Sequence, residues 1–209
     1  MPTIDELKKV RLEKLETLKK QGIDPYPATV NRKQPISTAL TMIDKPVAVT
    51  GRIIGLRVHG KIVFADIVDF SGKIQVVLKV DVLSKESQAL TELLDIGDFI
   101  ALQGSVSKTQ AGEISVFASD FQIITKSIRP LPDQWHGLKD VEERYRQRYV
   151  DLVMNSAIRD IFMTRTKVVQ FLRAFLDSDG FIEVETPVLQ PIYGGASAKP
   201  FVTHHNALG

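Results

Sequence analysis

Apolar and polar side chains alternate in short runs through the middle of the chain. An alternation with a period of two is typical of β-strands that bury one face and expose the other. The pattern predicts five strands, at residues 46–58, 62–69, 73–79, 98–106 and 113–125. Ser71-Gly72 supplies a tight turn between the second and third strands, and residues 83–95 are predicted to form a helix between the third and the fourth. The predicted order of elements is therefore β-β-β-α-β-β.

This order is the plan of an OB-fold, a five-stranded barrel with a helix after its third strand. The strand 2–3 face of that fold and its flanking loops bind oligonucleotides. We therefore expect residues 46–126 to form an OB-fold domain. The predicted fold class of the whole chain is mainly β plus α.

A helix is predicted before the barrel. Thr3 and Glu6 form a capping box, in which each side chain satisfies the other's backbone N–H group. Apolar residues then recur with a loose helical period until Gly22, where the helix should stop. Residues 23–44 contain three prolines and are predicted to be extended, so that residues 1–45 are an N-terminal helix and connector. The basic residues of the helix form either a solvated face or a contact to RNA phosphates: Lys8, Lys9, Arg11, Lys14, Lys19 and Lys20.

After the barrel the pattern becomes helical. Residues 127–140 contain prolines and a glycine and are predicted to be a linker. The second domain, residues 141–209, should begin with a helix over residues 141–153 and continue with a longer helix that Gly180 caps. A strand is expected over residues 181–186. One apolar stripe follows the longer helix, formed by Ile161, Val168, Val169, Leu172, Phe175 and Leu176.

Strand alternation also predicts which side chains leave the barrel core. If the small and β-branched residues of the second strand point inward, Phe64 faces outward. The same alternation places Gln75 outward on the third strand and Glu113 outward at the start of the fifth. An aromatic ring stacks on an unpaired base, while an amide and a carboxylate can hydrogen-bond base edges. These residues are candidates for RNA recognition.

Each candidate has a structural alternative. The opposite parity would place Phe64 in the core together with Ile62 and Val68. Arg57 either contacts a phosphate or base, or is a solvated charge at a strand end. Glu113 follows Ala-Gly and is alternatively a charge at the edge of a hairpin.

The composition limits the classes of protein and site. Charged residues make up 25% of the 209 residues and nearly cancel to +2, so any attraction to nucleic acid depends on where the cations lie. The chain has no cysteine, which excludes disulfides and cysteine-based zinc sites. No apolar run reaches the roughly 20 residues that cross a bilayer, and the first residues lack a signal-peptide pattern. We expect a cytoplasmic protein without a membrane partner.

Three stretches resemble bacterial lysyl-tRNA synthetases: LPDQWHGLKDVEERYRQRYVDL, FLDSDGFIEVETPVLQP and GGASAKPFVTHHNAL. The second is similar to motif 1 of class II synthetases, a helix and a strand that form much of the family's dimer interface. The resemblance implies an anticodon-binding OB-fold followed by the helical and strand start of a class II α+β catalytic domain. It also implies a homodimer through Phe175, Phe181 and Pro187, and lysine tRNA as the partner, bound by its anticodon stem-loop.

The resemblance also assigns binding residues. The family's anticodon contacts fall on Arg57, Phe64, Gln75 and Glu113. Gly194 and Gly195 match the glycine pair beside the family's lysine pocket, although without the resemblance they are more typical of an ordinary flexible turn. We expect no metal site at His204 and His205, because adjacent residues of an extended chain point in opposite directions.

The complete family enzyme uses ATP and Mg²⁺ to attach lysine to its tRNA. The ATP-binding arginines of motifs 2 and 3 do not occur before Gly209. We therefore expect no catalytic residue in this chain, no tight binding of a cofactor and no activity of the 209 residues alone. Two alternatives are a stand-alone OB-fold RNA-binding module without catalysis and a piece of an aspartyl or asparaginyl synthetase. The apolar stripe argues against the stand-alone module, which has no use for a large uncovered apolar face.

Overall fold

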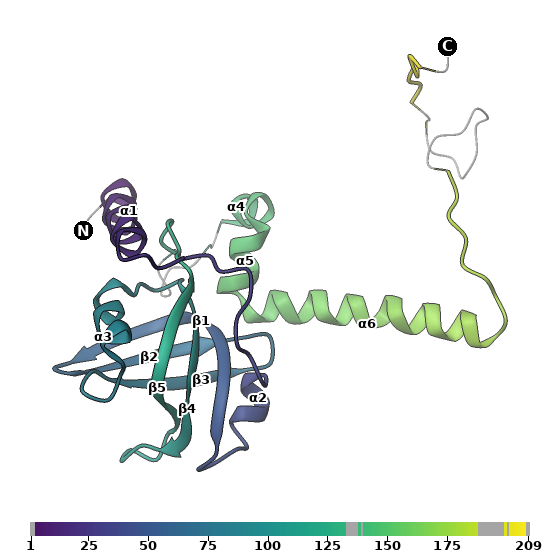
Figure 1. Ribbon diagram of the computed structural model, residues 1–209. Helices are drawn as coiled ribbons and strands as arrows, with labels where there is room; N and C mark the ends of the chain where they lie inside the picture. Colours follow the sequence, from purple (N-terminus) through teal and green to yellow (C-terminus); the bar gives the residue numbers. More distant parts are fainter. Residues whose placement is uncertain (1–2, 133–137, 139, 188–198, 200, 208–209) are drawn as a thin grey trace. The chain divides into compact units, whose positions relative to one another are not determined.

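The computed structural model describes residues 3–132, 138, 140–187, 199 and 201–207. The chain divides into two compact units, Met1–Gly137 and Leu138–Gly209 (Figure 1).

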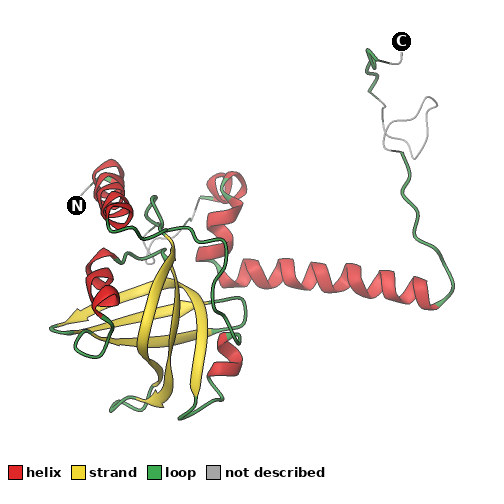
Figure 2. Cartoon of the chain, viewed as in Figure 1, coloured by secondary structure: helices red, strands yellow, loops and turns green. Residues whose placement is uncertain are grey.

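Five strands form a closed barrel in the first unit; strands are yellow in Figure 2. Their order around the barrel is β1-β2-β3-β5-β4. Neighbouring strands are antiparallel except β3 and β5, which are parallel. The strands are β1 Pro46–His59, β2 Ile62–Val68, β3 Lys73–Lys79, β4 Phe99–Lys108 and β5 Ile114–Thr125. The five strands and the OB-fold plan predicted from the alternating pattern are confirmed.

The alternation sorts side chains between the core and the outer face as predicted. On β2, Val63, Ala65 and Ile67 are buried, whereas the residues between them are partly exposed. Phe64 therefore lies on the outer face, and the opposite parity is wrong. The inner residues of all five strands pack into one apolar core with Leu18 of the N-terminal helix.

Two predicted segments differ from the structure. The helix expected over residues 83–95 is shorter: α3 spans Lys85–Leu90 and continues as a 3-10 turn, η1, over Thr91–Leu93. The connector is not extended throughout, because α2 forms at Ile36–Ala39. The apolar residues at both ends of α2 are fully buried against the barrel, and the Asp69 carboxylate accepts a hydrogen bond from the first backbone N–H of α2. Burial of these side chains overrides the extended tendency of the prolines.

The N-terminal helix α1, Ile4–Lys20, begins with the predicted capping box and ends before Gly22, whose φ is +74°. Two of its basic side chains hold it against the barrel. Arg11 is buried and donates hydrogen bonds to the carbonyls of Ile96 and Ser127, and Lys14 pairs with Asp95 at 2.8 Å. For these two cations both sequence interpretations are wrong, because they are neither solvated nor free for phosphate.

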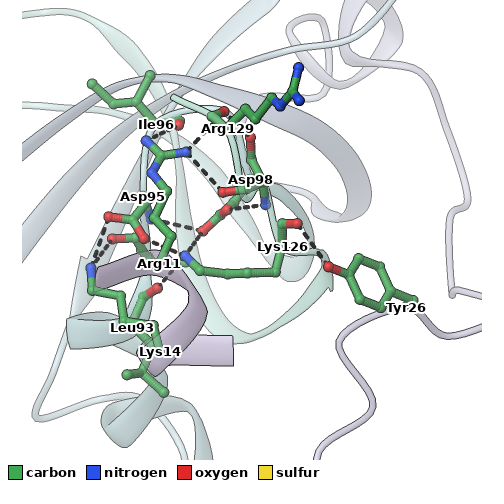
Figure 3. Close-up of polar contacts among 11 residues, drawn as sticks. Arg11, Lys14, Tyr26, Leu93, Asp95, Ile96, Asp98, Lys126 and Arg129 are labelled. Atoms are coloured by element: carbon green, nitrogen blue, oxygen red, sulfur yellow. Dashed lines mark hydrogen bonds and ion pairs between the residues drawn. The ribbon is translucent and has the colours of Figure 1, made fainter. Parts of the chain in front are cut away.

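A fully buried lysine lies beside this contact (Figure 3). Lys126 follows β5, and its ammonium donates to the Leu93 carbonyl and to the carboxylates of Asp95 and Asp98, at 2.7 Å from Asp98. Burial raises the pKa of Asp98, against the opposite effects of Lys126 and of the N–H groups of Ser127 and Asp95. The buried carboxylate therefore depends on the ammonium to offset its desolvation.

The second unit contains three helices among its described residues: α4 Val141–Arg146, α5 Arg148–Met154 and α6 Ser156–Ser178. The single helix predicted over residues 141–153 is wrong, because the chain leaves the helical conformation at Gln147, with φ −113° and ψ 51°. The break lets Arg144 and Arg148 converge on the buried carboxylate of Asp151. This ion-paired cluster joins the two short helices.

Gly180 ends α6 in the predicted left-handed conformation, with φ +86°. Residues 181–187 do not form the predicted strand; they belong to no β-ladder among the described residues. A strand is defined by hydrogen bonds to a neighbouring strand, which apolar alternation alone cannot supply. The apolar stripe of α6 is exposed. Within the described segments, none of the helices is both long and apolar enough to cross a membrane.

Replacing Lys126 with methionine should destabilise the protein by about 3–5 kcal/mol near neutral pH, because Asp98 would remain buried without its counter-ion. Losing the ammonium also raises the pKa of Asp98 further, since Lys126 lowers it. As the pH falls, Asp98 of the folded variant binds a proton at a pH at which Asp98 of the unfolded chain is still ionised. The loss of stability caused by the substitution should therefore shrink toward lower pH.

Urea unfolding of wild type and variant between about pH 7 and pH 5 measures this effect. Lys61→Met is the matched control, because Lys61 pairs with Asp81 on the surface, where both side chains are exposed. A stability difference for Lys126→Met that is as small as the control's, or that does not change with pH, would contradict the interpretation.

Candidate nucleic-acid interface

Four residues singled out from the sequence lie around one surface hollow of about 550 Å³: Arg57, Phe64, Gln75 and Glu113. We call it the β2–β3 hollow. Strand register explains the convergence, because Arg57 on β1 is paired with Phe64 on β2, and Phe64 with Val77 on β3. Glu113 reaches the same place from the loop before β5.

Gln75 is more buried than the sequence predicts. Alternation placed it on the outer face, yet only 6% of it is exposed, because β5 packs beside β3 and pairs Gln75 with Ser115. The expectation that it faces solvent freely is wrong. Its amide still lines the hollow, where Nε2 donates to Glu113 Oε2 at 2.9 Å.

Ser115 is a residue of this site that the sequence reasoning missed. It is fully buried, and its hydroxyl donates to Gln75 Oε1 at 3.0 Å. The Gln75 amide is thus held at both ends, by Ser115 and by Glu113. The signal was present in the sequence, since Ser115 shares the outward phase of Glu113 on the same strand.

The ring of Phe64 is held by its neighbours. The His59 ring meets it edge-on, with 6.1 Å between the ring centroids and 83° between the planes. Phe64 is partly exposed and lines the hollow. A ring fixed in this way offers a flat apolar surface for a base without first losing rotamer freedom.

Charges around the hollow are mainly positive. Arg57, Lys79 and Lys108 line it, and Glu113 is the one carboxylate among its described lining residues. Asp66 lies next to it, 3.5 Å from the Arg57 guanidinium. Asp66 Oδ1 is buried and has no hydrogen-bond partner among the described residues. The Asp66 carboxylate forms ion pairs with Arg57 and with Lys73, the latter at 3.4 Å. Such a lining favours a polyanion.

The other predicted site residues belong to the second unit. Gly194 and Gly195 lie outside the described residues, so the predicted lysine-pocket pair stays a prediction. Phe175 and Phe181, predicted at a dimer interface, are 55% and 61% exposed. Pro187 is the last described residue of its segment.

The β2–β3 hollow combines the kinds of group that bind an unpaired base: a ring for stacking, an amide and a carboxylate for the base edge, and cations for the phosphates.

Comparison with known protein families agrees with a nucleic-acid-binding barrel. Residues 47–124 match the family described as OB-fold nucleic acid binding domain. Residues 140–209 match the class II tRNA synthetases for D, K and N. The domains are therefore those of a class II aminoacyl-tRNA synthetase.

Individual proteins similar to this chain identify its family within class II synthetases. The chain is 52% identical to the lysine–tRNA ligase of Carboxydothermus hydrogenoformans and 50% identical to that of Syntrophomonas wolfei, in each case over 98% of its length. It spans 43% and 42% of the lengths of these two relatives. The chain belongs to the lysyl-tRNA synthetase family and corresponds to the N-terminal portion of its members.

Replacing Ser115 with alanine should destabilise the barrel by about 1–3 kcal/mol, because Gln75 Oε1 would lose its donor in a buried position. Ser119→Ala on the same strand is the control, since Ser119 is exposed and its hydroxyl donates to the Gln103 carbonyl, which leaves no buried side chain without its donor. Urea unfolding compares the two variants. Equal, small losses of stability would show that Ser115 does not hold Gln75.

Proposed function

We propose that this chain is the anticodon-binding portion of a lysine–tRNA ligase, the enzyme that uses ATP to attach lysine to its tRNA. The observation that carries the proposal is the 52% identity to a lysine–tRNA ligase over 98% of the chain. The convergence of the four predicted contact residues on one hollow supports it. The proposed location is the cytoplasm.

In the proposed complex an unpaired anticodon base stacks on Phe64, while Gln75 and Glu113 hydrogen-bond its edge. A uridine suits this pair, because its N3–H can donate to the carboxylate and its carbonyl can accept from the amide. Arg57, oriented by Asp66, contacts the phosphate or the base edge. Discrimination then rests on hydrogen bonds, and the ring contributes affinity to any base.

The catalytic reaction needs groups that we do not assign to this chain. ATP and Mg²⁺ are the proposed cofactors of the complete enzyme, and the arginines that would hold ATP do not occur in these 209 residues. Gly194 and Gly195 are proposed to lie beside the lysine substrate. The contribution of the described residues is to bind and place the tRNA.

Phe64→Ala should weaken binding of the lysine-tRNA anticodon stem-loop by about 1–3 kcal/mol, the usual value of one stacked base. Phe70→Ala is the control, because Phe70 is 80% exposed and lies outside the hollow. Fluorescence titration at fixed salt measures both, with circular dichroism to check folding.

An unchanged dissociation constant for a folded Phe64→Ala variant would refute the assigned role. Tighter binding of the anticodon stem-loop of aspartate or asparagine tRNA than of lysine tRNA would instead favour a piece of an aspartyl or asparaginyl synthetase. A stand-alone binding module would require that the second unit adds nothing to a larger enzyme, which its match to class II synthetases argues against.

We also propose that α6 and the following residues form a homodimer interface. The stripe on α6 exposes Val168, Leu172, Phe175 and Leu176, each between 46% and 55%. Burying one such side chain is worth about 1.5–3 kcal/mol, so the stripe favours association with a like face. The clustering of these residues on one helix face supports the proposal.

Phe175→Glu should shift the full chain toward the monomer, because a charge would enter the apolar contact. Gln170→Glu, an exposed polar position on the same helix, should leave the association unchanged. Light scattering over micromolar concentrations measures both. A wild-type chain that stays monomeric throughout this range would rule out the interface in this portion of the protein.

A further inference from the structure

A second hollow lies on the outer surface of the barrel next to the first. It has a volume of about 540 Å³, and its walls come from the start of β1, the end of β3 and the middle of β4 and β5. We call it the β4–β5 hollow. Val77, Lys79 and Phe117 line both hollows, so the two hollows adjoin at β3 and β5.

One row of paired residues crosses the strands from the first hollow to the second. Phe64 on β2 pairs with Val77 on β3, and Val77 pairs with Phe117 on β5. Phe117 pairs in turn with Ser105 on β4. Paired residues share a face of the sheet, so Phe64 and Phe117 lie two strands apart on the outer face, at about 10 Å. Both rings are partly exposed.

The walls of the β4–β5 hollow carry positive charge and hydrogen-bonding groups. Lys33 and Lys79 are exposed there, and no carboxylate is among its described lining residues. Gln103, Ser105 and Ser119 are also exposed in it and can donate or accept hydrogen bonds. The hollow therefore repeats the combination of ring, cations and polar groups found around Phe64.

Lys79 joins the two hollows. Its ammonium lies over the Phe117 ring, 5.4 Å from the ring centroid, and its side chain lines both hollows. A phosphate that links two nucleotides would meet this ammonium if one base lay on Phe64 and the next lay on Phe117. An extended single strand that crosses the β-strands satisfies this geometry.

We propose that the β4–β5 hollow is a second nucleotide subsite, in which Phe117 stacks the base that neighbours the one on Phe64 and Lys79 binds the phosphate between them. The occupant is single-stranded RNA of the same loop, because the hollow adjoins the first and carries the complementary charge. The proposal rests on the proposed function, since it extends the path of the bound anticodon loop.

The test uses the lysine-tRNA anticodon stem-loop with one base removed at a time from each loop position. In the wild-type full chain, removal of the base should weaken binding roughly tenfold at two adjacent positions. Phe117→Leu should abolish the penalty at one of these positions and keep it at the other. Phe64→Leu should do the reverse. Leucine preserves apolar contacts, and melting temperatures verify that both variants fold.

A substitution of Lys33 tests the contribution of positive charge in the β4–β5 hollow without changing the β2–β3 hollow, because Lys33 lines only the former of the two. Lys33→Ala should reduce the salt dependence of binding by about one phosphate contact. Lys85→Ala, at the start of α3 and outside both hollows, should not.

Two results overturn the subsite. If Phe64→Leu abolishes one penalty but Phe117→Leu leaves every penalty unchanged, the second subsite is wrong and the proposed function stands. If no base removal weakens binding to the wild-type chain, the proposed function and the subsite both fail.

Discussion

The parallel pairing of β3 with β5 is the constraint on which the proposed nucleic-acid face depends. Four residue pairs join these strands, from Gln75 with Ser115 to Leu78 with Ala118. They close the sheet into a barrel and bring Glu113 to the Gln75 amide across 38 residues of sequence. Parallel strands require a long crossover, which α3, η1 and β4 supply here. Without this pairing, Glu113 and Ser115 would not reach the Gln75 amide, which lies on the strand next to Phe64.

Local alternation predicts much of the barrel, because most strands have one face in a single core and the other toward solvent, although β3 is buried on both faces. The five strands and the outer position of Phe64 follow from this period alone. The helix start at Thr3 is equally local, since a capping box needs only residues three apart. The convergence of Arg57 with Phe64 needs only the antiparallel register of β1 and β2, which their short connection favours.

Features set by distant residues could not be predicted in this way. Gln75 has the expected parity but is buried by β5, which no local pattern reveals. In the sequence, Arg11 has the pattern of a solvated helix cation, and only the folded barrel places backbone carbonyls within its reach. The strand expected after Gly180 requires a partner strand, which the described residues do not provide. The buried ammonium of Lys126 likewise depends on two carboxylates that lie about 30 residues earlier in the chain.

In the proposed complex, discrimination between bases and affinity for the RNA are divided between different groups on this face. Gln75 is held by Ser115 and Glu113 before any ligand arrives, so recognition of a base edge costs little ordering of side chains. Arg57 and Lys79 remain largely exposed, and their attraction to phosphate is screened by salt. Because the whole chain carries a net charge of only +2, long-range attraction to RNA is weak, and the cations act mainly where they line the hollows. In the proposed complex, salt should therefore weaken binding of every sequence alike, whereas the choice between bases would rest on short-range hydrogen bonds that salt does not screen.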